Sequence, residues 1–238
     1  TLKNVQVLAC TFHSLGARIL RESIGLLGYR TDFTIYDQED SEKLLKNCLE
    51  EMELSSEKSI LKQIRMAISS AKNDLLGPED ITTDLVTQQA FRLYQMKLKE
   101  CNALDFDDLL YLPVKLFKEH EKARLEYQNR WLFILIDEYQ DTNSAQYTIA
   151  KTLVAKHQNI FAVGDPDQSI YSWRGARYQN ILNFESDFPG AKVITLDQNY
   201  RSTNTILAAA NALIQHNSER YDKKLWSQLG SGSKIGLY

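Results

Sequence analysis

The residues of this sequence best suited to chemistry are two adjacent carboxylates, Asp137 and Glu138. They follow five apolar residues at 132–136, a run typical of a strand buried on both faces, as in a parallel sheet. Open α/β sheets bind ligands beyond the carboxyl ends of such strands, where a nucleotide usually sits. One carboxylate can hold Mg²⁺ through its water shell, and its neighbour can take a proton from an attacking water. Taken alone, the pair also fits a solvated acidic turn.

A second polar group follows the apolar run at 160–163. The turn Gly164-Asp165-Pro166 ends this predicted strand and releases Gln168 just beyond the edge of the sheet. The side-chain amide of Gln168 offers both a donor and an acceptor, so it suits a terminal phosphate or the water that attacks it. Gln168 is therefore a candidate sensor of a terminal phosphate.

Aromatic and cationic side chains come soon after Gln168, at Tyr171, Trp173 and Arg174. Single-stranded nucleic acid is held by base stacking on such side chains, worth roughly 1–3 kcal/mol per base. The alternative is that Tyr171 and Trp173 are core residues and that Arg174 is a surface charge. Their position in a turn-rich segment beside the candidate phosphate sensor favours nucleic-acid binding.

A third segment contains Tyr200 and Arg201. A guanidinium that contacts a γ-phosphate can accelerate hydrolysis roughly 10³–10⁵-fold, and this is one role for Arg201. Tyr200 has an aromatic face on which a nucleotide base can stack. The alternative is that Arg201 is an ordinary helix-entry residue before a helix at 203–215.

The segments that position these residues alternate between strand and helix patterns, which favours a parallel sheet with crossover helices. Short apolar runs predict strands at residues 5–10, 132–136, 160–163 and 192–196. Helical patterns occur at residues 14–28, 40–53, 56–73, 83–99, 106–120, 144–156, 177–184 and 203–215. Ser14 is the expected N-cap of the first helix, and Gly28 its stop. The simplest account is an α/β core with an inserted helical subdomain.

The composition excludes several classes of protein. Of the 238 residues, 43% are apolar and 25% charged, which is ordinary for a globular protein. No apolar run approaches the length of a transmembrane helix, and nothing at the start resembles a signal peptide. The three cysteines fit neither a disulfide framework nor a zinc site, so we expect reduced thiols in a cytoplasmic protein: Cys10, Cys48 and Cys101.

The net charge of −3 gives no support for nucleic-acid binding, which must come from local patches and aromatic residues. The chain begins with Thr1 rather than methionine and leads directly into a strand-like segment. We therefore expect it to be an excised fragment.

Three segments together resemble helicase motifs II, III and IV of the UvrD/PcrA/Rep family of superfamily 1 helicases: residues 137–142, 164–176 and 198–202. Residues 11–14 resemble motif Ib, and residues 104–110 resemble a further family motif. The resemblance implies part of a RecA-like parallel-sheet core, the P-loop NTPase fold, with an inserted all-helical DNA-binding subdomain. Its implied domains are the first core (1–12 and 131–197), the helical insert (13–130) and the start of the second core (198–238).

The resemblance also implies a role for each candidate residue. Asp137 would bind Mg²⁺ with ATP, Glu138 would activate the hydrolytic water, and Gln168 would sense the γ-phosphate. Tyr200 would stack on adenine, and Arg201 would touch the γ-phosphate. Single-stranded DNA would contact the remaining candidates: Thr11, Phe12, His13, Tyr171, Trp173 and Arg174. By residue type alone, His13 is more often structural.

The chain departs from the family pattern at the phosphate-binding loop. No Gly-x-x-x-x-Gly-Lys-[Ser/Thr] occurs in the sequence, and Gly230-Ser-Gly-Ser-Lys234 lacks the required spacing. In that loop, backbone N–H groups cradle the phosphates and a lysine neutralises their charge. We therefore expect residues 1–238 alone to turn over little or no ATP.

The main functional hypothesis is a fragment of an ATP-dependent DNA helicase that moves 3′ to 5′ on single-stranded DNA and unwinds duplexes. Its expected partners are single-stranded DNA and duplex junctions, with ATP and Mg²⁺ as cofactors and no membrane. Polarity and unwinding rest on the resemblance. Two alternatives remain: a non-hydrolysing nucleic-acid-binding or protein-interaction module on the same scaffold, and the motor part of a helicase–nuclease. Repair, replication restart and plasmid replication all remain open as pathways.

Overall fold

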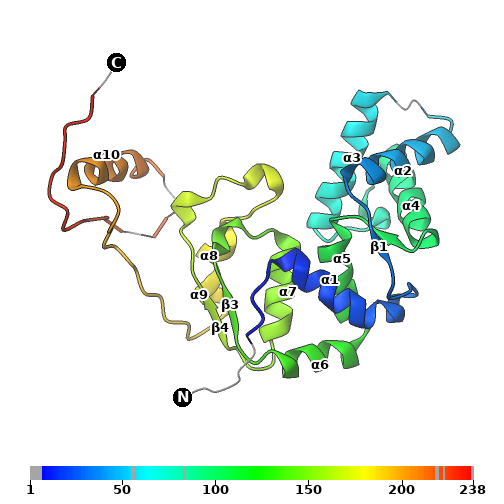
Figure 1. Cartoon of the computed structure of the whole chain (residues 1–238), viewed down its shortest axis with the longest axis horizontal. Coiled ribbons are helices and arrows are strands. Elements are labelled where there is room, and N and C mark those ends of the chain that lie inside the picture. The colour runs from blue at the N-terminus through cyan, green and yellow to red at the C-terminus, as the bar shows by residue number, and fades with distance from the viewer. Residues whose placement is uncertain (1–6, 55–56, 83, 218–219, 222, 237–238) are drawn as a thin grey trace. The chain divides into compact units, whose positions relative to one another are not determined.

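The computed structural model describes residues 7–54, 57–82, 84–217, 220–221 and 223–236 (Figure 1). The chain divides into two compact units. The first unit is Thr1–Leu135 with Thr142–Phe161, and the second unit is Ile136–Asp141 with Ala162–Tyr238. Within the described ranges, no helix combines the length and apolar character that crossing a membrane requires.

The first unit is mainly helical, as its spacing of apolar residues predicts. Its helices are α1 (Phe12–Ser23), α2 (Gln38–Glu51), α3 (Lys58–Asn73), α4 (Leu85–Glu100), α5 (Asp108–Glu119), α6 (Glu121–Arg130) and α7 (Ser144–Val154). Two 3₁₀ turns, η1 (Ile24–Leu27) and η2 (Pro78–Asp80), complete it.

The start of α1 differs from the prediction, which placed the N-cap at Ser14. Thr11 is the N-cap, because its side-chain oxygen accepts a hydrogen bond from the backbone N–H of Ser14 at 3.2 Å. The predicted stop is confirmed: Gly28 has a left-handed backbone (φ 78°) immediately after η1.

The apolar faces of these helices form separate clusters. One joins α2, α3 and α4 (Figure 1) and includes Leu49, Ile68 and Phe91. Another joins α1, α5, α6 and α7 and includes Ile19, Phe117, Tyr127 and Ile149. Gly16 allows α1 to lie directly on α5, because a Cβ at this position would be 1.8 Å from the carbonyl oxygen of Leu109.

The helical block also contains a short parallel sheet that the sequence did not predict. Strand β1 (Thr34–Ile35) pairs with β2 (Ala103–Leu104), with Thr34 opposite Ala103 and Ile35 opposite Leu104. Two residues per strand are too few for a sequence pattern. The block predicted to be all-helical is therefore helical with one small ladder.

The predicted strands at 132–136 and 160–163 are confirmed as β3 (Ile134–Ile136) and β4 (Ile160–Ala162), which pair with each other. The backbone N–H of Ile134 donates to the carbonyl oxygen of Asn159, and the backbone N–H of Val163 donates to the carbonyl oxygen of Ile136. These hydrogen bonds advance in the same direction along both strands, so the pair is parallel. The prediction of an α/β fold is therefore confirmed.

The expected burial of residues 132–136 on both faces is wrong for this structure. Ile136 is buried, but Leu135 and Phe161 on the neighbouring strand are 74% and 61% exposed. A two-stranded sheet presents too little surface for layers of helices to cover both faces. The apolar run therefore predicts the strand correctly but not its surroundings.

Two further predicted elements are wrong. Residues 192–196 form no strand; Ile194 and Leu196 are exposed, and the described residues pair no strand with them, which a ladder requires. The helix predicted at 177–184 is two single turns, α8 (Gln179–Leu182) and α9 (Phe184–Asp187). In the strand predicted at 5–10, residues 5–6 lie outside the described residues and residues 7–10 are not a strand.

The rest of the second unit consists of short elements and one longer helix. It contains the 3₁₀ turns η3 (Tyr139–Asp141), η4 (Pro166–Gln168) and η5 (Ser172–Arg174) and the helix α10 (Asn204–Ile214). Thr203 is the N-cap of α10, which confirms the helix predicted at 203–215 to within a residue at each end. Gln198 and Trp226 form an isolated parallel bridge beside it.

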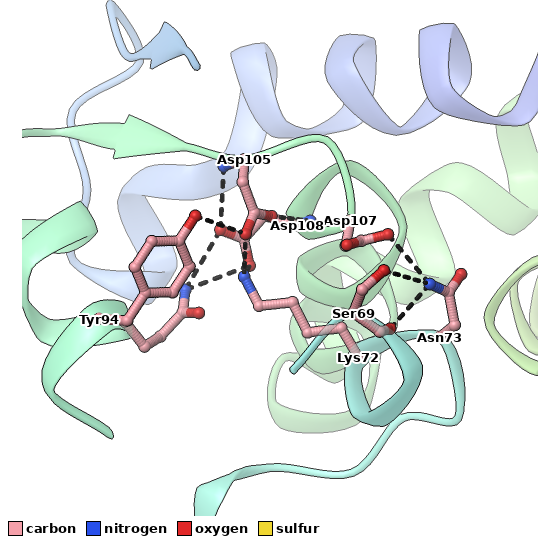
Figure 2. Close-up of polar contacts among 8 residues, drawn as sticks. Ser69, Lys72, Asn73, Tyr94, Asp105, Asp107 and Asp108 are labelled. Carbon is pink, nitrogen blue, oxygen red and sulfur yellow. Dashed lines mark hydrogen bonds and ion pairs between the residues drawn. The ribbon is translucent and has the colours of Figure 1, made fainter. Parts of the chain in front are cut away.

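A buried ion cluster joins three elements of the first unit (Figure 2). Lys72 on α3 is fully buried, with Nζ 2.7 Å from Asp105 Oδ2 and 2.8 Å from Asp108 Oδ1. The hydroxyl of Tyr94 on α4 donates to Asp105 Oδ2 at 3.1 Å. We call Lys72, Tyr94, Asp105 and Asp108 the Lys72 cluster; it holds α3 and α4 to the segment that begins α5.

The Lys72 cluster also fixes the backbone between its two carboxylates. The backbone N–H of Asp108 donates to Asp105 Oδ1 at 2.8 Å, and that of Asp105 donates to Asp108 Oδ2 at 3.3 Å. Phe106, which lies between the buried Asp105 and the half-buried Asp107 in this turn, is 59% exposed. The cluster therefore determines where this aromatic side chain lies.

The charges in the Lys72 cluster perturb one another. Burial and the charge of Asp105 raise the pKa of Asp108 to about 7, against the opposing effect of Lys72. Burial alone would lower the pKa of Lys72, but the carboxylates of Asp105 and Asp108 outweigh it and raise that pKa. The ammonium is therefore the group that makes two neighbouring buried carboxylates tolerable.

Replacing Lys72 with methionine should lower the free energy of unfolding by about 3–5 kcal/mol, because Asp105 and Asp108 would lose their buried cation. Chemical denaturation followed by circular dichroism measures this loss. Lys62→Met on the exposed side of α3 is the matched control and should stay within about 0.5 kcal/mol of the unmutated chain. Equal effects of the two substitutions would contradict the role of the cluster.

Candidate functional site

The two carboxylates expected at the end of a strand lie there. Strand β3 ends at Ile136, and Asp137 and Glu138 follow it with both side chains exposed. The backbone N–H of Glu138 donates to Asp137 Oδ1 at 2.9 Å. Glu138 has a left-handed backbone (φ 51°), which is uncommon for a residue with a Cβ. This turn presents both carboxylates at the carboxyl end of the parallel pair.

Gln140 connects the segment after β3 with the segment after β4. Its side chain is almost completely buried; Nε2 donates to Glu138 Oε2 at 2.8 Å, and Oε1 accepts from the backbone N–H of Asp165 at 3.0 Å. Gln140 was not among the site residues predicted from the sequence. Its signal was an amide within an acidic segment, since an amide can donate to a carboxylate and accept from a backbone N–H.

Gly164 makes that connection possible. A Cβ at this position would lie 2.5 Å from Gln140 Oε1, 2.9 Å from Ile181 Cδ1 and 3.1 Å from the backbone nitrogen of Tyr139. These distances are too short for any larger residue without movement. The segments after β3 and β4 therefore approach each other more closely than a side chain at residue 164 permits.

Gln168 is linked to Glu138 through the same contacts. It lies exposed at the end of η4, and its Nε2 donates to Asp165 Oδ2 at 2.8 Å. Glu138, Gln140, Asp165 and Gln168 thus form a continuous sequence of hydrogen-bonded residues, which we call the Glu138–Gln168 chain. The structure therefore joins the candidate base to the candidate phosphate sensor.

Two carboxyl groups in this region have shifted pKa values. Burial opposes ionisation of Asp165, but the hydrogen bonds from Lys223 and Gln168 outweigh it and hold the pKa of Asp165 below its usual value. Burial, with the charge of Glu138, raises the pKa of Asp141. Asp141 Oδ1 is buried and accepts no hydrogen bond from the described part of the chain.

The aromatic segment is accessible. Trp173 is 72% exposed and Tyr171 is 39% exposed, on and beside the turn η5, which ends at Gly175 with a left-handed backbone (φ 81°). The alternative that Trp173 is a core residue does not fit this exposure. The side chain of Arg174 lies outside what the structure describes.

Tyr200 and Arg201 are also exposed but are not joined to the Glu138–Gln168 chain. The hydroxyl of Tyr200 donates to Gln198 Oε1 at 3.0 Å, and the backbone N–H of Arg201 donates to Asn199 Oδ1 at 2.9 Å. No hydrogen bond or ion pair links their side chains to Glu138 or Gln168 within the described ranges. Arg201 lies two residues before the N-cap of α10, as the helix-entry interpretation expects.

The candidates at residues 11–13 lie in the first unit. Thr11 caps α1, and Phe12 is partly buried against the cluster that joins α1 to α5. The ring of His13 stacks on Phe106, with centroids 4.0 Å apart and planes at 20°, and burial lowers the pKa of His13. Phe106 was missed as a site residue, although an aromatic side chain within an acidic segment is a signal that sequence alone contains.

The described carboxylates suit a magnesium ion that arrives with phosphates. Asp137 offers one exposed carboxylate at the strand end, and no group of three metal-ligating side chains occurs among the residues that the structure describes. Mg²⁺ usually binds through one or two carboxylates together with substrate phosphates and water. A single carboxylate in this position fits that mode of binding.

Comparison with known proteins identifies the family. The family model described as UvrD/REP helicase N-terminal domain matches residues 2–189, and that of the UvrD-like helicase C-terminal domain matches residues 194–238.

Similar proteins include ATP-dependent DNA helicase PcrA of Bacillus subtilis, which is 45% identical over 234 residues, 96% of this chain and 32% of that protein. ATP-dependent DNA helicase Rep of Escherichia coli is 43% identical over 231 residues, 94% of this chain and 34% of that protein. The chain spans about a third of the length of the curated relatives it matches.

Replacing Gly164 with alanine should destabilise the second unit by about 1–3 kcal/mol, because the new methyl group would displace the Gln140 amide. Thermal melting of the unmutated chain and of Gly164→Ala measures the loss of stability. Gly25→Ala is the control, since a Cβ there meets nothing within 4 Å, and its melting temperature should be unchanged or slightly raised. Unchanged stability in Gly164→Ala would contradict the close approach described above.

Proposed function

The chain belongs to the UvrD/REP helicase family, and from that premise we propose that the protein containing it is an ATP-dependent helicase. It moves 3′ to 5′ on single-stranded DNA and unwinds duplexes at junctions. The observation that supports this most directly is the Glu138–Gln168 chain, which lies at the carboxyl ends of a parallel strand pair. Nucleotides bind at such strand ends in open α/β sheets.

Hydrolysis uses the two carboxylates after β3. Asp137 would hold Mg²⁺ together with ATP, and the bound ion would neutralise part of the phosphate charge. Glu138 accepts the proton of the attacking water. The hydrogen bond from Gln140 fixes one oxygen of Glu138, so the carboxylate has a set orientation before the nucleotide arrives.

Gln168 connects this chemistry to nucleic acid. It hydrogen-bonds the terminal phosphate, and its bond to Asp165 transmits a change in its position towards Gln140 and Glu138. Tyr171 and Trp173 follow within five residues and stack on bases of single-stranded DNA, with Arg174 supplying a positive charge. Phosphate state and DNA contact are thereby linked within one short segment.

The remaining candidates have separate proposed roles in the two units. Tyr200 stacks on adenine, and Arg201 approaches the γ-phosphate from a second RecA-like core that begins at residue 198. In the first unit, Thr11, Phe12 and His13 lie along the DNA track. The exposed face of Phe106 beside His13 extends the aromatic surface available there.

The same proposal divides the chain as expected from its motifs. Residues 1–12 and 131–197 belong to the first core, residues 13–130 to the DNA-binding insert, and residues 198–238 to the second core. Helices α2 to α6 and most of α1 belong to the insert, and α7 with the ladder of β3 and β4 belongs to the first core.

In the full-length protein, Glu138→Gln should leave ATP binding intact and slow DNA-stimulated hydrolysis by about 10²–10⁴-fold, because the near-isosteric amide cannot accept a proton. Steady-state ATPase assays and nucleotide binding measure the two effects. Glu185→Gln, an exposed glutamate of the same unit, is the control and should retain normal turnover.

Normal turnover by Glu138→Gln would remove Glu138 from the role of base. No ATPase activity in the unmutated full-length protein, with single-stranded DNA present, would instead support a non-hydrolysing binding module.

Trp173→Ala in the full-length protein should weaken binding of single-stranded DNA by roughly 1–3 kcal/mol, because it removes a stacking surface. The melting temperature should hardly change, since the side chain is 72% exposed. Fluorescence anisotropy with a labelled oligothymidine and a thermal melt test both expectations. Trp173→Phe keeps an aromatic face, so its affinity for DNA should lie between those of the unmutated protein and Trp173→Ala. A large loss of stability in Trp173→Ala with unchanged DNA affinity would favour a structural role.

A further inference from the structure

Two carboxylates on the turn after β4 face two cations more than fifty residues later in the sequence. Lys223 forms an ion pair with Asp165, and its Nζ is 3.5 Å from Asp167 Oδ2. Arg220 Nη2 is 3.1 Å from the same oxygen of Asp167. We call Asp165, Asp167, Arg220 and Lys223 the ion-pair latch, and all four lie in the second unit.

The ion-pair latch is largely shielded from solvent. The side chains of Arg220 and Asp167 are 12% and 6% exposed, and those of Lys223 and Asp165 are 13% and 22% exposed. Exposed ion pairs contribute little to stability, whereas removing one member of a shielded pair leaves a charge without compensation. Two positive charges here balance two negative charges, so each member depends on the others.

A separate contact fixes the segment that carries the two cations. The hydroxyl of Tyr221 donates to the carbonyl oxygen of Ile181 on α8 at 3.2 Å. Arg220 Nη2 also donates to the carbonyl oxygen of Lys223 at 3.3 Å. The cations are therefore positioned by contacts of their own segment and not only by the carboxylates that they meet.

Asp165 is where the ion-pair latch meets the Glu138–Gln168 chain. Its Oδ1 faces Lys223 and accepts from the backbone N–H of Asp167 at 3.0 Å, while its Oδ2 accepts from Gln168 at 2.8 Å. A carboxylate is rigid and planar, so a cation that fixes one oxygen also fixes the other. The orientation of the Gln168 amide thus depends on Lys223.

We propose that Lys223 is a positioning residue that presets Gln168 for the terminal phosphate of ATP, with Arg220 steadying the neighbouring carboxylate of Asp167. This inference rests on the function proposed above and adds a regulatory link to it. Residues 198–238 form the start of the second core in that proposal. The second core thereby controls the phosphate sensor of the first core through a side chain that itself touches no substrate.

The test uses the full-length protein and the substitution Lys223→Met, with Lys224→Met as the matched control, because Lys224 is the adjacent and exposed lysine. DNA-stimulated ATPase activity gives kcat, and binding is measured for ADP and for a non-hydrolysable ATP analogue. Lys223→Met should lower kcat about tenfold to a hundredfold. It should also weaken binding of the ATP analogue, because the Gln168 amide would no longer be preset to donate to the γ-phosphate. Affinity for ADP should be unchanged, since ADP has no γ-phosphate, and Lys224→Met should behave as the unmutated protein.

A double-mutant cycle separates positioning from stability. If Lys223 acts through Gln168, adding Lys223→Met to Gln168→Ala should not lower kcat further. Multiplying losses of kcat in the double variant would overturn the proposal, as would an equal loss of affinity for ADP and the ATP analogue. Those results would make the latch a structural contact only.

A second pair of variants covers poor folding of Lys223→Met. Asp165→Asn removes the charge that Lys223 balances, so Asp165→Asn with Lys223→Met leaves no such charge unpaired at residue 165. This double variant should have the kcat of Asp165→Asn alone, and a further loss would overturn the positioning role. Full activity of Gln168→Ala would contradict the sensing role that the proposed function gives to Gln168, because the sensor would then be dispensable whatever Lys223 does.

Discussion

The buried side-chain amide of Gln140 joins the two segments on which the second unit depends. One end donates to Glu138 and the other accepts from the backbone of Asp165, so the turns after β3 and β4 have a fixed separation. At that separation, a side chain at residue 164 would have to displace the Gln140 amide. A leucine at residue 140 would have similar bulk but could satisfy neither partner. Residue 140 must therefore carry a side-chain amide, and its two hydrogen bonds fix the relative position of the turns after β3 and β4.

Sequence patterns predicted the features that depend on neighbouring residues. Helical spacing located α1 to α5, α7 and α10, but not α6, and apolar runs located β3 and β4, because these patterns are set by residues close in the chain. Glu138 and Gln168 were identified as candidates because each lies within five residues after the end of an apolar run. The exposure of Trp173 was also expected from its turn-rich surroundings.

Features that depend on distant partners were missed. A strand was predicted at residues 192–196 from local composition, but a strand exists only with a neighbour to pair with. Lys72 meets Asp105 across more than thirty residues, and Lys223 meets Asp165 across more than fifty. Nothing in the spacing of one sequence indicates such pairs. The ladder of β1 and β2 was missed for the same reason, since its strands are more than sixty residues apart.

The left-handed backbone of Glu138 has a consequence for how this region tolerates change. A residue with a Cβ in that conformation carries strain of about 1–3 kcal/mol, which glycine or asparagine would relieve. Substitutions that relieve this backbone strain therefore remove the carboxylate of residue 138. If Glu138 has the role proposed above, selection for thermal stability alone would favour proteins that are more stable but lack the general base. The proposed role and the backbone conformation then place opposite demands on one residue.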